Sequence, residues 1–292
     1  MVECNVCGWT GEQFRELNSP GHAISDLNVF CPRCGAYERH RAAAYYLSAT
    51  GILRGHRSAL EIGPGMIRAY KHVLEAAGLS YLSLDLWPGF GDVQGDVVAA
   101  PLTTGSFDLI VCSHVLEHVS DDHRALEEMH RMMAPGGLVL LQLPYDDRRF
   151  ETFENCIAPT SSLGSGYYYG HLREYGLDII ERLRCFWPEV REIQPLLAIN
   201  RAEAVRHGFE KNYGTILICS GAVNGLRTPG VLQRDLTNAK RRWLTQLEAY
   251  FVWQKHGHRQ PLDDWLEAEK RVVMMSDEEV ARSYVGHVLK RD

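Results

Sequence analysis

Four cysteines near the N-terminus have the spacing of a metal site. They form two Cys-x-x-Cys-Gly motifs, Cys4 to Gly8 and Cys31 to Gly35. Each motif can present two thiolates to one point, and four such ligands suit tetrahedral zinc. A site with four protein ligands leaves no open position, so we expect a structural zinc; the alternative is two unrelated reactive cysteine pairs. The predicted zinc ligands are Cys4, Cys7, Cys31 and Cys34.

A second polar group, His114-Val115-Leu116-Glu117-His118, follows a strand-like run. Imidazole and carboxylate groups can take a proton from an acceptor hydroxyl or hold a divalent ion. The string also matches the His-x-x-Glu-His motif of inverted zinc peptidases, but those enzymes carry it on a helix. The alternative to both is an ordinary loop whose histidines line a pocket or cap a helix.

A glycine loop, Gly63-Pro64-Gly65, follows the apolar run Ser58 to Ile62. A strand that breaks into such a loop is typical of nucleoside cofactor sites, because glycine lets the backbone approach the ligand closely. The dinucleotide fingerprint would need glycine or alanine at position 68, where this chain has Arg68. The pattern therefore argues against NAD.

The elements that must position these groups alternate between strands and helices. Helical spacing covers Ala42 to Leu53, Ile67 to Ala77 and His123 to Met133. Strands separated by helices imply an α/β fold, with a Rossmann-like parallel sheet covered by helices on both faces. Ligands then bind at the carboxyl ends of the strands. The candidate strands are Ser58 to Ile62, Tyr81 to Leu86, Phe107 to Cys112, Leu138 to Leu143, Val190 to Ile193 and Thr215 to Cys219.

Four motifs in register resemble class I S-adenosylmethionine (SAM) methyltransferases over roughly residues 40 to 221. Glu61-x-Gly63-x-Gly65 resembles their motif I, although Ile67 stands where the family usually has a third glycine. Asp85 ends the second strand, where a carboxylate can accept both hydrogen bonds from a ribose diol. Asp96 lies where the family's acidic residue meets the adenine amine. The resemblance implies these cofactor-binding residues: Glu61, Gly63, Gly65, Asp85, Leu86, Asp96, Val97, Ser113 and His114.

The Leu116-Glu117-His118-Val119 continuation and the turn at Pro135-Gly136-Gly137 also resemble this family. Methyltransferases of ubiquinone synthesis and of small-RNA ends carry Glu-x-x-Glu-His here and hold a divalent ion that activates the acceptor oxygen. The first glutamate is His114 in this chain, and His171 lies where those families often have another histidine. The catalytic candidates are His114, Glu117, His118, His171 and Tyr145, with Tyr168 as a further acceptor contact.

Three segments define the predicted domain organisation. Residues 1–40 form a zinc ribbon, 41–222 a methyltransferase domain, and 223–292 a helical C-terminal extension. The ribbon followed by Glu38-Arg39-His40-Arg41 resembles a set of bacterial methyltransferases with an N-terminal zinc ribbon. The aromatic stretch at about 145–170 is either a mobile lid over the acceptor site or a surface insertion. The C-terminal helices pack on the sheet domain or form a homodimer contact.

The composition of the chain limits which partners and locations we expect. The 292 residues carry a formal net charge of −6, which disfavours a nucleic-acid partner. No apolar stretch reaches membrane-span length, and Cys4 follows the N-terminus without a signal sequence, so we expect no membrane partner and a cytoplasmic location. We therefore expect a SAM-dependent methyltransferase acting on a small-molecule acceptor, with an oxygen of a sugar-linked or secondary metabolite favoured. The alternatives are an RNA methyltransferase whose zinc ribbon grips the nucleic acid, and a non-catalytic SAM-binding scaffold. The basic cluster available to an RNA near the ribbon is thin and consists of Arg39, Arg41, Arg54 and Arg57.

Overall fold

The chain divides into two compact units in the computed structural model. The first comprises Met1–Pro144, Glu154–Glu174 and Phe186–Asn224, and the second comprises Tyr145–Phe153, Tyr175–Cys185 and Gly225–Asp292. The structure describes residues 1–17, 26–144, 149–154, 171–193, 195, 201–209, 215–221 and 275–276. Over these ranges, none of the helices combines the length and the apolar character that crossing a membrane requires.

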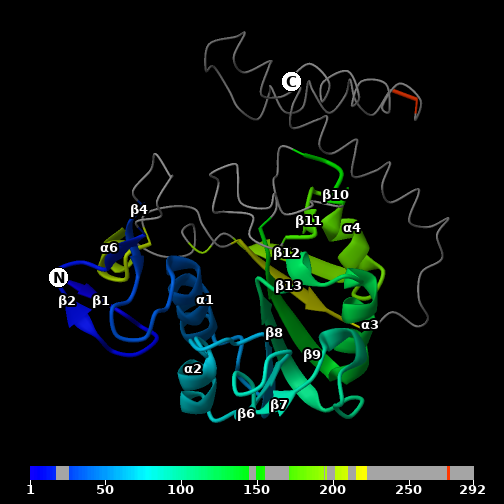
Figure 1. Ribbon diagram of the computed structural model, residues 1–292, viewed down its shortest axis with the longest axis horizontal. Helices are drawn as coiled ribbons and strands as arrows, with labels where there is room; N and C mark the ends of the chain where they lie inside the picture. Colours follow the sequence, from blue (N-terminus) through cyan, green and yellow to red (C-terminus); the bar gives the residue numbers. More distant parts are fainter. Residues whose placement is uncertain are drawn as a thin grey trace. The chain divides into compact units, whose positions relative to one another are not determined.

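A seven-stranded sheet forms the centre of the first unit, in the order β12-β13-β9-β8-β5-β6-β7 (Figure 1). The strand order reverses direction between β5 and β8, and a ligand crevice is expected outside the carboxyl ends of those two strands. The strands are β5 (Ser58–Ile62), β6 (Ser80–Asp85), β7 (Val93–Gln94), β8 (Phe107–Ser113), β9 (Met133–Gln142), β12 (Glu189–Ile193) and β13 (Ile216–Ser220).

All six strands predicted from the sequence are present, but the prediction of a wholly parallel sheet is wrong. Strand β13 pairs antiparallel with both β9 and β12, whereas the pairs among β5, β6, β7, β8 and β9 are parallel. Strand β9 also begins at Met133, five residues before the predicted start at Leu138. Its first residues pair with Phe107 across a bulge, which short-range apolar patterning does not reveal.

The central strands are apolar on both faces because helices cover both. In β8, Leu109 and Val111 contribute to a core cluster shared with Leu47 of α1 (Glu38–Ala49) and Leu74 of α2 (Lys71–Ala76). Alternate residues of a strand point to opposite faces, so buried Ile110 faces the other way. Helix α3 (Asp122–Met132) lies on the other side of the sheet from α1 and α2 in Figure 1.

Helix α2 begins at Lys71 and not at Ile67, so the predicted start is wrong by four residues. The intervening segment contains Arg68 with a φ of +44°, a left-handed conformation that no α-helix accommodates. Arg68 Nη1 donates to Asp92 Oδ1 at 2.7 Å, and Nη2 donates to the Phe90 carbonyl at 2.9 Å. These contacts hold the unusual conformation, and the chain turns once more before the helix starts.

The N-terminal cysteine module consists of two hairpins and shares a core with the sheet domain. Buried Phe14 and Ala36 of the module pack in one cluster with Ala44 of α1, and Val73 of α2 packs against it. The predicted boundary after residue 40 falls inside α1, which contacts both parts. The module strands are β1 (Val2–Glu3), β2 (Thr10–Gly11), β3 (Arg15–Leu17) and β4 (Asp26–Phe30), and α6 (Arg201–Arg206) packs against β1.

Short elements complete the described chain. In the second unit, α4 (Ile179–Arg184) follows a turn in which Thr152 Oγ1 donates to Asp178 Oδ1 at 2.6 Å. The other short elements are η1 (Val97–Ala99), η2 (Leu116–His118), β10 (Phe153–Glu154) and β11 (Arg173–Glu174). The predicted lid at about 145–170 falls mostly outside the described residues, as do the predicted C-terminal helices after 223, so both stay predictions.

Candidate functional site

The four predicted zinc ligands lie together. Their sulfur atoms are within 4.8 Å of one another, and the Cys4–Cys34 and Cys7–Cys31 sulfur pairs are each 3.7 Å apart. Zn–S bonds of about 2.3 Å in a tetrahedron place the sulfurs about 3.8 Å apart, whereas a disulfide bond is about 2.05 Å long. The donor set and its spacing therefore fit one tetrahedral ion and exclude the disulfide alternative in this conformation.

Two turns with the same backbone geometry present these sulfurs. The Gly8 amide donates to the Cys4 carbonyl at 2.7 Å, and the Gly35 amide donates to the Cys31 carbonyl at 2.9 Å. Both glycines have left-handed φ angles, +71° and +74°, which a side chain would strain. The glycine after each motif is thus required by the turn.

Burial and crowding disfavour the thiolate forms of Cys4 and Cys7. A hydrogen bond with Cys34 and burial raise the pKa of Cys4, and burial raises the pKa of Cys7 to about 11. Thiols in this environment stay protonated near neutral pH unless a positive ion stabilises the thiolates. Zinc would supply that charge.

Arg41, which sequence reasoning placed in a surface cluster, is fully buried beside this module. Its guanidinium donates to the carbonyls of Ala36 at 2.8 Å and Val29 at 3.1 Å, both in the module. It also donates to the His207 carbonyl at 2.9 Å. Arg41 therefore joins segments that are far apart in the sequence, and only the Arg39-His40-Arg41 string hinted at a special role.

The glycine loop lies at the carboxyl end of β5, next to the strand-order reversal. Gly63 and Gly65 have left-handed φ angles of +64° and +54°. A Cβ on Gly63 would lie 2.4 Å from Val115 Cγ2, whereas a Cβ on Gly65 would meet nothing within 4 Å. Gly63 is thus needed for packing, and Gly65 leaves open space for a ligand against the backbone.

Asp85 ends β6 beside this loop, and its carboxylate is buried. Oδ2 accepts from the Gly65 amide at 3.2 Å and Oδ1 accepts from the Trp87 amide at 2.9 Å. The carboxylate thereby connects the glycine loop to the next loop of the same edge. Leu86 and Trp87, which follow, are exposed.

Replacing Asp85 with alanine should weaken SAM binding by about 1.5–3 kcal/mol, because the ribose loses charge-assisted hydrogen bonds and the Gly65 loop loses an anchor. Titration calorimetry measures this change. Asp108→Ala is a matched control, since Asp108 Oδ2 also accepts from two backbone amides, those of Arg57 and Ser58, at the opposite edge of the sheet. Unchanged SAM affinity in Asp85→Ala, or preferential binding of NAD, would contradict the assignment.

Glu61, the acidic residue of the loop motif, is buried in β5. Tyr81 donates its hydroxyl to Glu61 Oε2 at 2.6 Å. Burial raises the Glu61 pKa to about 7, and the Tyr81 hydrogen bond only partly counters this effect. The carboxyl group is therefore close to half-ionised at neutral pH, and a bound cation would favour its charged form.

Relative to the wild type, Glu61→Gln should have a higher free energy of unfolding at pH 8 than at pH 5. The folded-state pKa of about 7 exceeds the ordinary value of 4.5, so the stability contributed by the protonated carboxyl is present below pH 4.5 and lost as the pH rises to 7. The lost amount is about 3 kcal/mol. Urea unfolding of the wild type, the variant and the half-exposed control Glu127→Gln measures it. An equal stability difference between Glu61→Gln and wild type at pH 5 and pH 8 would refute the burial effect.

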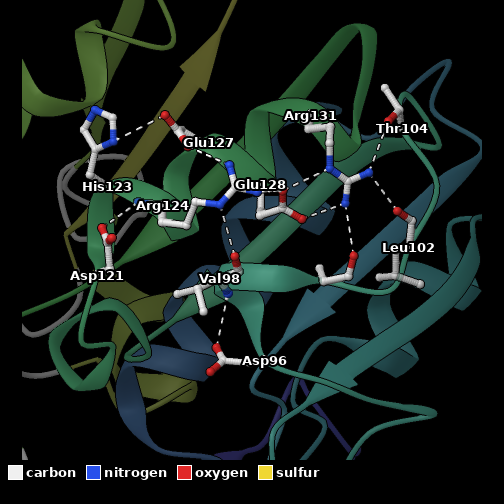
Figure 2. Close-up of polar contacts among 11 residues, drawn as sticks. Asp96, Val98, Leu102, Thr104, Asp121, His123, Arg124, Glu127, Glu128 and Arg131 are labelled. Atoms are coloured by element: carbon white, nitrogen blue, oxygen red, sulfur yellow. Dashed lines mark hydrogen bonds and ion pairs between the residues drawn. The ribbon is translucent and has the colours of Figure 1, made fainter.

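Asp96 and Val97, predicted to hold the adenine, are the N-cap and the first residue of η1. Arginines of α3 contact this segment, and Figure 2 shows Asp96, Val98 and Arg124 together. Asp96 Oδ1 accepts from the Val98 amide at 3.1 Å, and Arg124 Nε donates to the Val98 carbonyl at 3.2 Å. Arg131 Nη2 donates to the Ala100 carbonyl at 3.1 Å and to Glu128 Oε2 at 2.7 Å. The two arginines thus determine where this segment lies at the rim of the site.

The predicted acid–base cluster also comes together, after β8. Glu117 is fully buried in η2, and its Oε1 is 3.1 Å from His114 Nδ1 and 3.9 Å from His171 Nε2. The rings of His118 and His171 pack edge to face, 4.7 Å apart. Ser113 lies next to the cluster and donates to Gln142 Oε1 at 3.1 Å. The positive φ of His114, +55°, turns the chain sharply enough to bring 114 and 117 together.

The charges of the cluster follow from burial. Burial opposes ionisation of Glu117, but the hydrogen bond and charge interaction with His114, together with smaller backbone and His118 contributions, outweigh it and hold the Glu117 pKa below its usual value. Burial lowers the pKa of both His114 and His171. At neutral pH the Glu117 carboxylate therefore lies beside neutral His114 and His171 imidazoles, which can accept a proton or bind a metal.

Arg173, which sequence reasoning missed, holds the distant His171 segment on this cluster. Its buried guanidinium donates to the carbonyls of Leu116 and Val119, and its Nε is 3.0 Å from Glu154 Oε2. The Leu172 amide donates to the Glu117 carbonyl at 2.7 Å. In the sequence, the only feature that pointed to Arg173 was its place two residues after the candidate histidine His171.

Tyr145 and Tyr168 lie outside the described residues, so their roles stay predictions.

The sheet order and the glycine loop are typical of nucleoside-binding α/β domains, and comparison with known proteins shows which proteins this chain resembles. Residues 42–141 match the family described as a methyltransferase domain. An ajmaline N-methyltransferase of Rauvolfia serpentina is 27% identical over 121 residues, 41% of this chain and 36% of that protein. A demethylmenaquinone methyltransferase of Thermus thermophilus is 31% identical over 85 residues, 29% of this chain and 34% of that protein.

Among solved structures, an S-adenosylmethionine-dependent methyltransferase of Mesorhizobium loti is 19% identical with a TM-score of 0.41, covering 62% of this chain and 98% of that one. The chain spans about a third of the length of the two curated relatives above. The similarity to a methyltransferase domain thus covers residues 42–141 of this chain.

Proposed function

We propose that this protein transfers a methyl group from SAM to a small-molecule acceptor, with an oxygen of a sugar-linked or secondary metabolite as the methylated atom. The observation that most supports this proposal is the buried Glu117 carboxylate, which contacts His114 and lies near His171 at the carboxyl edge of the sheet. An alkyl-transfer reaction needs alignment and exclusion of water, but a hydroxyl acceptor also needs a group that takes its proton.

The residues at the carboxyl edge fit SAM. SAM supplies an electrophilic methyl group on a sulfonium ion when bound. Asp85 would accept from the ribose hydroxyls, and the open space beside Gly65 would admit the cofactor against the backbone. Asp96 would accept from the adenine amine. Glu61, whose burial costs free energy in its charged form, would be stabilised by the positive charge of the cofactor.

The acceptor would be activated by the Glu117 cluster. A neutral His171 can take the hydroxyl proton as methyl transfer proceeds, and the nearby Glu117 carboxylate stabilises the resulting imidazolium. His114 orients Glu117 through its 3.1 Å hydrogen bond. Both curated relatives are named for small-molecule acceptors, which supports this choice of substrate size.

A divalent ion at the same cluster is the second candidate mechanism. Glu117, His118 and His171 each offer one ligand atom, and these atoms lie within 4.8 Å of one another. No residue that the structure describes donates to the buried Glu117 Oε2, so this oxygen can accept from a ligand. A metal held there would lower the pKa of an acceptor hydroxyl.

The cysteine module would hold one structural zinc in a ribbon-like fold. Its sulfur spacing and its need for a cation support this assignment. Because Arg41 and α1 join the module to the sheet domain, the zinc would stabilise the wall of the methyltransferase site and not a separate appendage.

An RNA acceptor is less well supported. Arg41 is fully buried, which removes it from the basic cluster that the sequence suggested. Arg54 and Arg57 are exposed, but they precede β5 and so lie near the amino-terminal edge of the sheet, opposite the predicted cofactor loop. A nucleic acid gripped there would not reach the Glu117 cluster.

Turnover of methyl-labelled SAM against fractionated cell metabolites and total RNA tests the proposal. Label transferred to a metabolite fraction supports it, and label confined to RNA favours the alternative. If calorimetry shows SAM binding but no methyl label reaches metabolites or RNA, the result favours the non-catalytic SAM-binding scaffold. A protein that does not bind SAM would contradict all three.

A further inference from the structure

Arg39 is an arginine at the site whose guanidinium has no counterion in the described part of the chain. It lies in the first turn of α1, directly after the second cysteine turn. No residue in the described part of the chain accepts a hydrogen bond from its buried Nε. Buried Arg41 and Arg173 differ, because each donates to several backbone carbonyls. Arg39 as a whole is half-buried, but an Nε withdrawn from water without an acceptor is destabilising unless a ligand supplies one.

The backbone of Arg39 is fixed over the carboxyl edge of the sheet. Its carbonyl accepts from Gln142 Nε2 at 3.2 Å, and Gln142 is the last residue of β9. The Gln142 carbonyl accepts from the His114 amide at 2.7 Å, and its side chain accepts from Tyr70 at 2.6 Å. Arg39 is thus connected to the acid–base cluster and to the helix that follows the glycine loop.

The side chain of Arg39 is held in one orientation. Its Cζ lies 4.4 Å from the centroid of the Tyr37 ring, within cation–π range. Burial lowers the pKa of Arg39, and the Glu117 carboxylate counters this effect in part, although no ion pair forms between them. Burial and, to a smaller extent, the charge of Arg39 lower the pKa of His114. The guanidinium therefore belongs to the same electrostatic environment as the predicted methyl-transfer site and keeps its donors available.

We propose that Arg39 binds a carboxylate at the methyl-transfer site. The planar guanidinium fork matches a carboxylate with two parallel hydrogen bonds, which a Lys ammonium cannot reproduce. Two ligands of the proposed reaction could carry this group: the amino-acid end of SAM and an acidic acceptor. This inference rests on the proposed function for the identity of the site and adds the ligand chemistry that it recognises.

Calorimetry with SAM and with decarboxylated SAM distinguishes the first source. If Arg39 binds the cofactor, wild type should prefer SAM roughly 10- to 100-fold, and Arg39→Gln should lose that preference while keeping its affinity for decarboxylated SAM. Arg39→Lys should lose most of it, because the charge remains without the fork. Arg57→Gln, an exposed arginine change at the other edge, should behave as wild type.

Acetate and benzoate are the probes for the second source, titrated by NMR into the free protein and its S-adenosylhomocysteine complex. Probe binding that disappears in Arg39→Gln, with the SAM preference unchanged, assigns the carboxylate to the acceptor. If Arg39→Gln alters neither the SAM preference nor probe binding, the inference is wrong. Wild type that binds no SAM contradicts the proposed function, while the probe titration still tests Arg39. Thermal melting and zinc content identify misfolded variants, for which Arg39→Lys supplies the comparison.

Discussion

Glu117→Gln should lower methyl transfer by roughly 10²–10⁴-fold while leaving SAM affinity nearly unchanged. The carboxylate is fully buried and contacts His114, so the substitution removes the only negative charge at the cluster among the described side chains without removing its volume. His171→Ala should have a similar effect if His171 takes the acceptor proton. Single-turnover assays with labelled SAM, together with calorimetry, separate chemistry from binding.

Chelation decides between a proton-accepting cluster and a divalent ion. If an ion is needed, chelator-treated protein should lose activity and regain it with magnesium or manganese, with its structural zinc content checked before and after. If the cluster acts without metal, activity survives chelation and His118→Ala still lowers turnover. His123→Ala, an exposed histidine change on α3, is the matched control. Full activity in both His118→Ala and His171→Ala would show that these residues are structural.

Cys31→Ser should release the zinc and destabilise the N-terminal module. Elemental analysis of freshly reduced wild type should find close to one zinc per chain, and the variant should hold almost none. Structural zinc sites contribute about 10–16 kcal/mol of binding free energy in small zinc-dependent folds, so a large fall in the melting temperature of the module is expected. Limited proteolysis should locate the unfolding before α1.

Cys112→Ser is the matched control for this experiment. Cys112 is also buried, but it lies in β8 and away from the four-sulfur cluster. The control should keep its zinc even if the core substitution costs some stability. A disulfide in place of zinc in reduced wild type, or a Cys31→Ser variant that keeps its zinc, would show that the four cysteines do not share an ion.

Local patterns predicted the centre of this fold well. The run from Ser58 to Ile62 is apolar because both faces of β5 are covered, and its bounds match the structure. The two cysteine turns were predictable because each motif contains its own glycine. These features depend on neighbours within a few residues, so the sequence by itself determines them. The antiparallel pairing of β13 was not predictable in this way, because the direction of a strand depends on the path by which the preceding connection brings the chain back to the sheet.

Contacts between distant segments were decided only by the tertiary structure. Arg41 read as part of a basic patch, yet carbonyls as distant as His207 surround it. Arg173 brings His171 next to Glu117 by binding the carbonyls of η2. The sequence supplied the residue types for chemistry, the cysteines and the Glu117 cluster. Burial set their charges and their partners, because desolvation depends on atoms that come together only when the whole chain folds.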